Sequence, residues 1–277
     1  MVWHTRIEDW RTKVEQRKNV MKMNIQIINT KLIEALKKVK VKGKYYTGGS
    51  TKNESMGNHV AIGASSNGVR LCNANHFAMC RIDIESHDKT VIVNKPGDIV
   101  VEIDKLVANL NGFSKDTLLD IEAGDYLEIG GPSGLAKMPL MMNHPLPAAI
   151  NQIQNMSISD KVIVGKTELT TKLQILPLLV EPVVKGCKII DIGRYKFDYD
   201  SSRENLVIST SKSATEGFSA SVGIVESEGE SAIVEFSGPF LDFFNSAVAL
   251  NVCMRDDAPI VFYNDNELLV KAPFIEG

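Results

Sequence analysis

The sequence lacks the features of secreted, membrane-spanning and metal-dependent proteins. Its four cysteines, Cys72, Cys80, Cys187 and Cys253, stand too far apart for a CxxC metal motif or a dense disulfide framework. No apolar run reaches the ~18 residues that cross a bilayer, and the charged start "MVWHTRIEDWRTKVEQRK" is unlike a signal peptide. We therefore expect reduced cysteines packed in the interior, no metal, no membrane partner, and a protein that stays in the compartment where it is made.

Catalytic signatures are also missing. The sequence contains no Walker loop, no GxGxxG after a strand, no HExxH and no GxSxG. "GGPSG" (130–134) follows a strand without opening a helix, which indicates a turn rather than a phosphate site. These absences favour a binding or scaffold protein without a cofactor. An enzyme with a β-rich fold and an unrecognised site stays an open alternative.

Length and charge distribution are more informative. With 277 residues, 44% of them hydrophobic and 23% charged, the chain is long enough for two soluble domains. Its net charge of −3 argues against nucleic acid, because duplex-binding proteins usually carry a basic excess. However, "KLIEALKKVKVKGK" (31–44) holds six lysines against Glu34 alone. A strongly basic segment therefore lies inside an acidic protein.

Residues 1–22 form a segment of their own. Trp3, Ile7, Trp10 and Val14 recur at helical spacing and predict one apolar stripe on a charged helix. The segment is either a terminal helix that packs on the body or a start upstream of Met23 as the natural first residue. The alternative is an arm that binds a partner.

Residues 23–136 predict the first domain. After the strand "NIQII" the pattern indicates a helix at 30–39 with Thr30 as its N-cap. A run of strands, a second helix at 104–113 and two closing strands follow. Residues 137–160, rich in proline and methionine with little alternation, are expected to be the connector between domains.

Residues 161–277 predict a second domain with the same order of elements. Its first helix is expected at 168–184, kinked or divided by Pro177, and its second at 238–247. "VVEIDKLVANL" and "IVEFSGPFLDFF" are then equivalent strand-to-helix junctions of a duplicated module. The expected fold class is α+β with two duplicated domains.

The C-terminal stretch carries a family resemblance. "FLDFF" (240–244), "VALNVCM" (248–254), "RDDAPIVFY" (255–263) and "APFIE" (272–276) occur in an order and at spacings that resemble the end of DNA sliding clamps of the proliferating cell nuclear antigen type. In that family a helix with an L-x-x-F-F-like core precedes an alternating strand, an acidic turn with D-x-P, and a final APxIE. The resemblance extends more loosely over residues 23–277, and the segment before Met23 is a departure from it.

The resemblance implies a ring of clamp domains, with helices lining a central hole and antiparallel sheets outside. It implies a polymerase processivity factor that encircles double-stranded DNA, closes as a homotrimer, is opened by an ATP-driven clamp loader, and needs no cofactor. Its location would be cytoplasmic, or nuclear in a eukaryote. Lysines on or near the helices would contact phosphates, and the alternative for each is a solvated surface charge. They are Lys31, Lys37, Lys38, Lys40, Lys42, Lys105, Lys172, Lys185 and Lys188.

The resemblance also implies a pocket for the peptides of DNA polymerase and other clamp-binding proteins, under the connector and beside the C-terminal tail. A methionine-rich lining suits several partners, and ordinary interdomain packing is the alternative for these methionines. The matching residues are Leu140, Met141, Met142, Leu146, Pro259, Ala272 and Pro273.

Subunits of such a ring would pair through open strand edges. The resemblance places these edges at 126–130 and 205–211. The expected interface residues are Tyr126, Leu127, Ile129, Leu206 and Ile208. A different arrangement remains open, in which a monomeric or dimeric factor of viral type holds DNA on a basic face without closing a ring.

Overall fold

The computed structural model of the chain describes residues 23–40, 58–75, 77–86, 90–140, 148–158, 161–191, 193–244 and 247–274. Two compact units divide these residues, and the chain passes from unit 1 to unit 2 and back within residues 73–82. Unit 2 comprises 73–82 and the described residues from 148 onward, and unit 1 comprises the remainder. The domain boundaries proposed above stay a prediction. The apolar stripe of residues 1–22 lies outside the described residues, as do Lys42, Met141, Met142 and Leu146.

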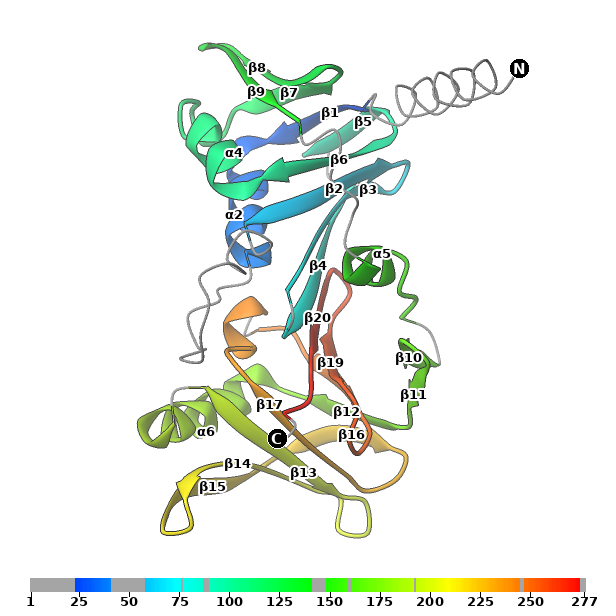
Figure 1. Ribbon diagram of the computed structural model, residues 1–277, viewed down its shortest axis with the longest axis vertical. Coiled ribbons are helices and arrows are strands. Elements are labelled where there is room, and N and C mark those ends of the chain that lie inside the picture. Colours follow the sequence, from blue (N-terminus) through cyan, green and yellow to red (C-terminus); the bar gives the residue numbers. More distant parts are fainter. Residues whose placement is uncertain are drawn as a thin grey trace, which may run out of the picture. The chain divides into compact units, whose positions relative to one another are not determined.

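The first half of the chain alternates strands with two helices (Figure 1). Its elements are β1 (Met23–Ile28), α2 (Asn29–Val39), β2 (His59–Ser65), β3 (Gly68–Ala74), β4 (Ala78–Glu85), β5 (Val91–Lys95), β6 (Gly97–Glu102), α4 (Ile103–Leu110), β7 (Leu118–Ala123), β8 (Tyr126–Gly131) and β9 (Gly134–Pro139).

The second half begins with a short helix and a hairpin and then repeats the same order. Its elements are α5 (Ala148–Gln154), β10 (Val162–Val164), β11 (Thr167–Leu169), β12 (Thr171–Ile175), α6 (Pro177–Ile190), β13 (Arg194–Asp200), β14 (Asn205–Ser213), β15 (Glu216–Val222), β16 (Ile224–Glu228), β17 (Ala232–Ser237), the 3-10 helix η3 (Leu241–Phe243), β18 (Leu250–Met254), β19 (Ile260–Tyr263) and β20 (Glu267–Lys271).

Strand pairing shows the duplication directly. In unit 1 the strands lie in the order β5-β1-β7-β8-β9, and β2 pairs with β6. In unit 2 the order β16-β12-β18-β19-β20 repeats the first arrangement, and β13 pairs with β17 as β2 does with β6. The helical segments α2, α4, α6 and η3 each follow the equivalent strands β1, β6, β12 and β17. The prediction of two duplicated α+β domains is confirmed.

Three local predictions are wrong for identifiable reasons. The N-cap of α2 is Ile28, and Thr30 instead donates its hydroxyl to the carbonyl of Lys115 at 2.5 Å. The range expected to be one helix at 168–184 holds parts of three elements, because it begins in β11, "TKLQI" alternates as the strand β12, and Pro177 opens α6. Proline suits the first turn of a helix, where its missing N–H removes no hydrogen bond. The helix expected at 238–247 is only η3 within the described residues.

The aromatic residues on both sides of η3 belong to the core of unit 2. Phe240 and Phe244, which flank it, are both buried. Phe240 stacks on Phe262 with 4.8 Å between ring centroids and meets Phe236 edge-on at 5.5 Å. The cluster of rings joins β13, β17 and β19 into one interior.

The strands expected to be open edges are interior strands. β8 lies between β7 and β9, and β14 lies between β13 and β15. The prediction that 126–130 and 205–211 form edges is therefore wrong. Within the described residues, β9 and β15 are the outermost strands on those sides. β9 runs from Gly134 to Pro139, so its last three residues overlap the start of the connector expected at 137–160.

Candidate functional site

The two helices of unit 1 are fixed to each other by a buried amide. Asn29 has no exposed surface, and its Nδ2 donates to the carbonyls of Leu110 at 3.0 Å, Phe113 at 3.2 Å and Ser114 at 3.2 Å. These carbonyls lie at and just beyond the C-terminal end of α4, where backbone acceptors lack helical partners. The start of α2 is thereby tied to the end of α4, and the helices pack side by side (Figure 1).

The solvent side of α2 is basic. Leu32 and Leu36 are fully buried, whereas Lys37 and Lys38 are exposed and Lys31 is partly exposed. Within α2 three lysines stand against one glutamate. The first turn has no acidic residue, and the lysines of the last turn stabilise the negative end of the helix dipole. The predicted lysines of α2 therefore do share one accessible surface.

The predicted cations beside α4 are neutralised by neighbours. Lys40 Nζ lies 2.6 Å from a carboxylate oxygen of Asp104, and Lys105 Nζ lies 2.6 Å from Glu102. α4 itself carries one acidic and one basic residue, so its formal charge is zero. In unit 1 the net positive charge of the described helices comes from α2.

α6 of unit 2 is only weakly basic. Lys185 pairs with Glu181 at 2.8 Å, and Lys188 lies 3.9 Å from Asp242 of η3. The lysine holds the pKa of the exposed Glu181 carboxyl below its usual range, mainly by hydrogen bonding. Two lysines against one glutamate give the helix a formal charge of +1.

Apolar side chains dominate the exposed side of α6. Leu178 is 62% exposed, Leu179 51% and Ile189 84%. The buried side, which includes Val180 and Val184, faces the protein interior. The helix surface that would correspond to the basic face of α2 is therefore hydrophobic.

Lys172 does not belong to a helix. It lies on β12 and forms one row across the sheet with Cys253 of β18 and Val261 of β19, because directly paired residues point to the same face. The adjacent row on the opposite face contains Leu173 and Phe262, and Phe262 packs into the aromatic core. Lys172 thus projects from the side of the sheet that faces away from the core. We call this side, on β16, β12, β18, β19, β20 and residues 78–82 of β4, the outer face.

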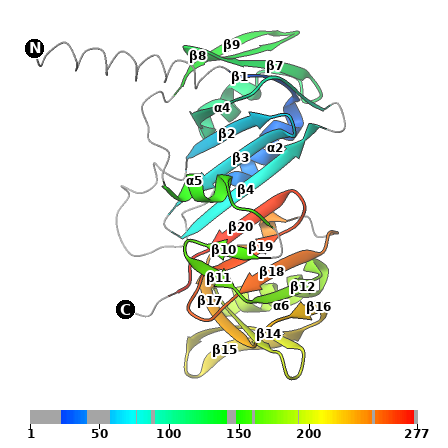
Figure 2. The same cartoon turned by 90° about the vertical axis from the view of Figure 1, so that its right-hand side faces the viewer.

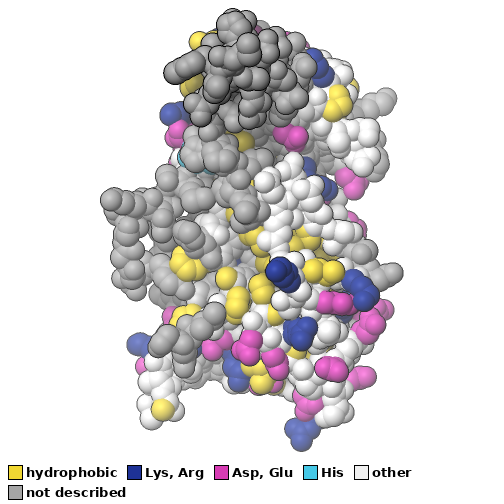
Figure 3. All heavy atoms as spheres, turned by 45° about the vertical axis from the view of Figure 1, so that its right-hand side comes forward, with side chains coloured by type: hydrophobic (Ala, Val, Ile, Leu, Met, Phe, Trp, Pro, Cys, Tyr) yellow, Lys and Arg dark blue, Asp and Glu magenta, His cyan; other side chains and the backbone are white. Residues whose placement is uncertain are grey.

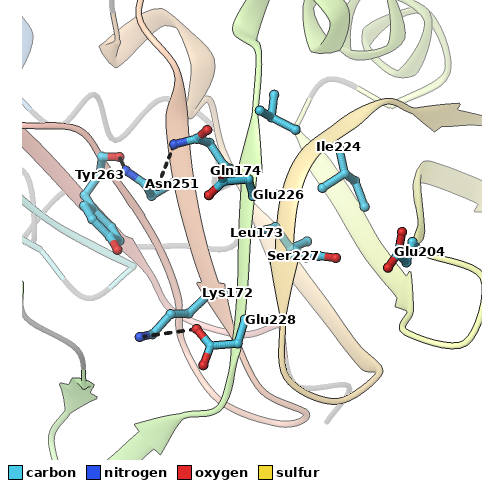
Figure 4. Close-up of a pocket in the computed structure, with 11 residues that line it drawn as sticks. Lys172, Leu173, Gln174, Glu204, Ile224, Glu226, Ser227, Glu228, Asn251 and Tyr263 are labelled. Carbon is cyan, nitrogen blue, oxygen red and sulfur yellow. Dashed lines mark hydrogen bonds and ion pairs between the residues drawn. The ribbon is translucent and has the colours of Figure 1, made fainter.

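A hollow of about 610 Å³ surrounds Lys172 (Figure 4). It lies around β16 and β12 and is lined by Lys172, Leu173, Gln174, Glu204, Ile224, Val225, Glu226, Ser227, Glu228, Asn251 and Tyr263. Three of these residues are glutamates, and Lys172 lies 3.9 Å from Glu228. Because Lys172 lies on β12, its grouping with the helix lysines is wrong, and its contact with DNA stays a prediction.

Two ionisable groups in and beside the hollow, the Tyr263 hydroxyl and the Cys253 thiol, are weak nucleophiles. Burial raises the pKa of the Tyr263 hydroxyl to about 12 and that of the neighbouring Cys253 thiol to about 11. Both groups are protonated at neutral pH and are poor nucleophiles in that form. All four cysteines are buried, as expected. Within the described ranges, no three His, Cys, Asp or Glu side chains gather as a metal site and no helix is long and apolar enough to span a bilayer.

Three residues meet at one end of the outer face. Ile260 pairs with Lys271, and Lys271 pairs with Ala78. The next row across the sheet therefore contains Pro259, Ala272 and Phe77 on adjacent segments of the same chain. The backbone N–H of Ala272 donates to the carbonyl of Phe77 at 2.9 Å. The structure thus brings two of the predicted pocket residues together. It adds Phe77, a 39% exposed aromatic ring that the sequence analysis missed.

The tail after β20 is held in place beside this row. Pro273 forms an isolated bridge with Phe236, and the N–H of Phe274 donates to the carbonyl of Glu235 at 2.6 Å. The Arg194 guanidinium lies 4.1 Å from the centroid of the Phe274 ring and pairs with the Glu235 carboxylate. The predicted pocket residue Leu140 lies in unit 1 and is only 7% exposed.

The remainder of the outer face is partly covered. α5 and the β10–β11 hairpin lie on this side of unit 2, whereas α6 lies on the other (Figures 1 and 2). Leu268 and Val270 of β20 point outward yet are almost fully buried. In the lower half of Figure 3, hydrophobic side chains lie next to one another, with both acidic and basic side chains among and around them.

Comparison with solved structures identifies the fold. The chain is similar to PCNA of A. fulgidus, in a structure with the C-terminal region of FEN-1, with 16% identity, a TM-score of 0.65, and coverage of 92% of this chain and 99% of that one. It is also similar to PCNA of Thermococcus kodakaraensis, with 13% identity, a TM-score of 0.62, and coverage of 91% and 100%. At these identities the likeness establishes the fold, which is that of sliding clamps.

Bacterial clamps show the same fold over a longer chain. A putative DNA polymerase III beta subunit of Eubacterium rectale matches with 14% identity and a TM-score of 0.70, and 91% of this chain covers 66% of that one. No protein-family model matches the sequence, and no curated protein matches it significantly.

Proposed function

We propose that this chain is a subunit of a DNA sliding clamp, a ring that encircles duplex DNA and tethers a DNA polymerase and other replication proteins to it. The observation that carries the proposal is the repeated module, in which equivalent strand orders in both units carry a helical segment after each equivalent strand. The clamp fold of the solved relatives supports it. The chain acts as a scaffold rather than an enzyme and needs no cofactor.

DNA is held by the helix face of unit 1 without sequence readout. The lysines of α2 contact phosphates, which supplies affinity that is independent of base sequence and sensitive to salt. Diffuse contacts of this kind let the ring move along the duplex while it remains threaded. An ATP-driven clamp loader opens the ring, as in the family that the sequence resembles.

The ring closes as a homotrimer through β9 and β15. In unit 2, β20 continues the sheet onto residues 78–82 of β4. β9 is the equivalent of β20, and β15 is the equivalent of β4, since each occupies the same place in its strand order. Each has an open side within the described residues. Pairing of β9 with β15 of another copy repeats the β20–β4 contact and removes both open edges.

Partner proteins bind the outer face of unit 2 through short peptides. Phe77, Pro259 and Ala272 form the apolar floor of the peptide site, beside the tail that ends at Phe274. A solved relative is bound to the C-terminal region of FEN-1. Because the ring keeps the partner at a high effective concentration near DNA, each peptide contact can be weak.

Topological binding is tested with linear duplexes whose ends are open or blocked. Rings that thread from the ends are retained when a bulky protein then caps both ends, and they escape when the ends stay free. Solution mass provides the second measurement, with three times the chain mass of 30.5 kDa expected. Equal escape from capped and open DNA, together with a mass of one or two chains, would overturn the ring and favour a factor that binds DNA on one basic face.

A further inference from the structure

A buried arginine connects the outer face to the connector. Arg81 of β4 is only 6% exposed. Its Nη1 donates to the carbonyl of Met156 at 2.7 Å and to that of Ile153 at 3.4 Å. Ile153 lies in the last turn of α5 and Met156 two residues beyond the helix, and all three residues belong to unit 2.

The chemistry of this contact suits the end of a helix. The carbonyl of Ile153 also accepts the backbone N–H of Met156, and both acceptors lie at the negative end of the helix dipole, where a cation is stabilising. A charged donor makes stronger hydrogen bonds than a neutral one, and the geometry of a guanidinium allows it to serve two carbonyls. Arg81 therefore both satisfies and positions this end of α5.

α5 depends on contacts of this kind. It has seven residues, and a helix that short is marginal by itself. It contains no charged side chain that could pair with the outer face. Ile150 and Ile153 are almost fully buried, and Met156 is 8% exposed. The apolar side of the segment supplies its attachment to the body, and Arg81 fixes where the segment ends.

Arg81 also shares a strand with the peptide site. Arg81 pairs with Leu268 and Met79 with Val270, so both side chains point to the outer face, and Phe77 continues the alternation. Four residues along a strand separate Arg81 from Phe77, a distance of about 13 Å. The strand that supplies the exposed ring of the site therefore also carries the anchor of the connector.

We propose that Arg81 is a positioning residue that holds α5 against the outer face and thereby sets the affinity of clamp-binding peptides for the neighbouring site. This inference rests on the proposed function, because it assumes that peptides bind beside Phe77. Arg81 itself makes no contact with the peptide. Its loss lowers the fraction of molecules in which the connector is docked, and affinity falls in proportion to that fraction.

The test measures peptide binding and connector order in the full-length protein. The probe is a synthetic peptide of the FEN-1 C-terminal region, followed by fluorescence anisotropy. Arg81→Met keeps the length of the side chain but removes its charge and donors, Arg81→Lys keeps one charged donor, and Ile153→Ala loosens α5 from the other side of the contact. Phe77→Glu disrupts the proposed floor directly. Hydrogen exchange of residues 148–158 reports whether α5 stays docked, and solution mass reports assembly.

We expect Arg81→Met to weaken the peptide about tenfold, as when the docked fraction falls to about one tenth. Exchange in 148–158 should be faster and the solution mass unchanged, with Arg81→Lys intermediate in both affinity and exchange. If Arg81→Met perturbs folding, Ile153→Ala must show the same linked change. The inference would be overturned if Arg81→Met left the peptide affinity unchanged while exchange in 148–158 became faster, or if it left that exchange unchanged. Either result would leave the proposed function intact. Absence of binding to the unaltered protein would overturn the peptide site and the inference together.

Discussion

Removal of the α2 lysines tests which part of the molecule holds DNA. The perturbation is Lys37→Gln with Lys38→Gln, two exposed positions on the solvent side of α2. Neither side chain packs in the interior, so the fold and the solution mass should not change. We expect weaker retention of DNA and a smaller dependence of binding on salt.

The magnitude follows from counterion release. Each lost phosphate contact lowers the slope of log K against log salt concentration by about 0.9. A trimer loses six lysines, so the slope falls by about 5 if all of them contact phosphate. It falls by about 2 if the duplex touches one α2 at a time. The assay is the equilibrium binding of the ring to linear duplex with open ends between about 50 and 200 mM salt.

The ion pairs in the structure provide matched controls. Lys185→Gln on α6 removes a lysine that already pairs with Glu181, so its effect on the slope should be small. Asp104→Asn frees Lys40 from its partner and adds one positive charge per chain, so the slope should become steeper. An unchanged slope in the α2 variant, or a larger loss from the α6 variant, would refute the assignment of DNA contact to α2.

Two further predictions concern assembly and stability. Leu135→Glu, at a 67% exposed position of β9, should convert trimers to single chains in solution. Val225→Glu on the outermost strand β16 should leave the solution mass unchanged. Equal solution masses of the two variants would contradict the β9–β15 pairing. Burial lowers the pKa of Lys271 to about 8, so the native state holds fewer protons than the unfolded state between pH 8 and about 10.5. Lys271→Met should therefore raise the free energy of unfolding by about 3 kcal/mol below pH 8, and this difference should vanish as the pH rises to about 10.5. Denaturant unfolding of both proteins across that pH range measures the difference. An advantage independent of pH would mean that the lysine is not desolvated.

The duplicated architecture could be predicted from the sequence because its signals are local. The apolar period of α2, with Leu32 and Leu36 buried, and the alternation of β1 are readable from short windows. The same strand-to-helix pattern occurs at Glu102 in the first half and at Glu235 in the second. Such patterns indicate which side of an element is buried, and the two halves of the chain share this pattern of buried positions.

The bounds of the helices and strands and the residues of the surface site could be predicted less well, because one stretch of sequence can fit two structures. "TTKLQILPLLV" fits a helix if Pro177 is treated as a kink, and a strand followed by a helix if Pro177 is treated as the first helical residue. The second pattern was available from the preference of proline for helix starts. Phe77 is different, since nothing in its local sequence marks it. Its place in the site results from the pairing of β4 with β20, two strands far apart in the chain.

The uneven charge of the helices has a consequence for how a clamp of this kind would hold DNA. In the proposed trimer, cations come from α2 of each chain, while α6 presents Leu178 and Ile189. Three basic patches then alternate with three apolar ones around the hole. Because screening limits attraction between exposed charges to about 8 Å at physiological salt, the duplex is drawn toward a patch rather than held at the centre. Contact with one α2 at a time gives the smaller change in the salt slope, about 2. The salt titration that locates the DNA contact therefore also distinguishes a duplex at the centre of the ring from one that contacts a single subunit.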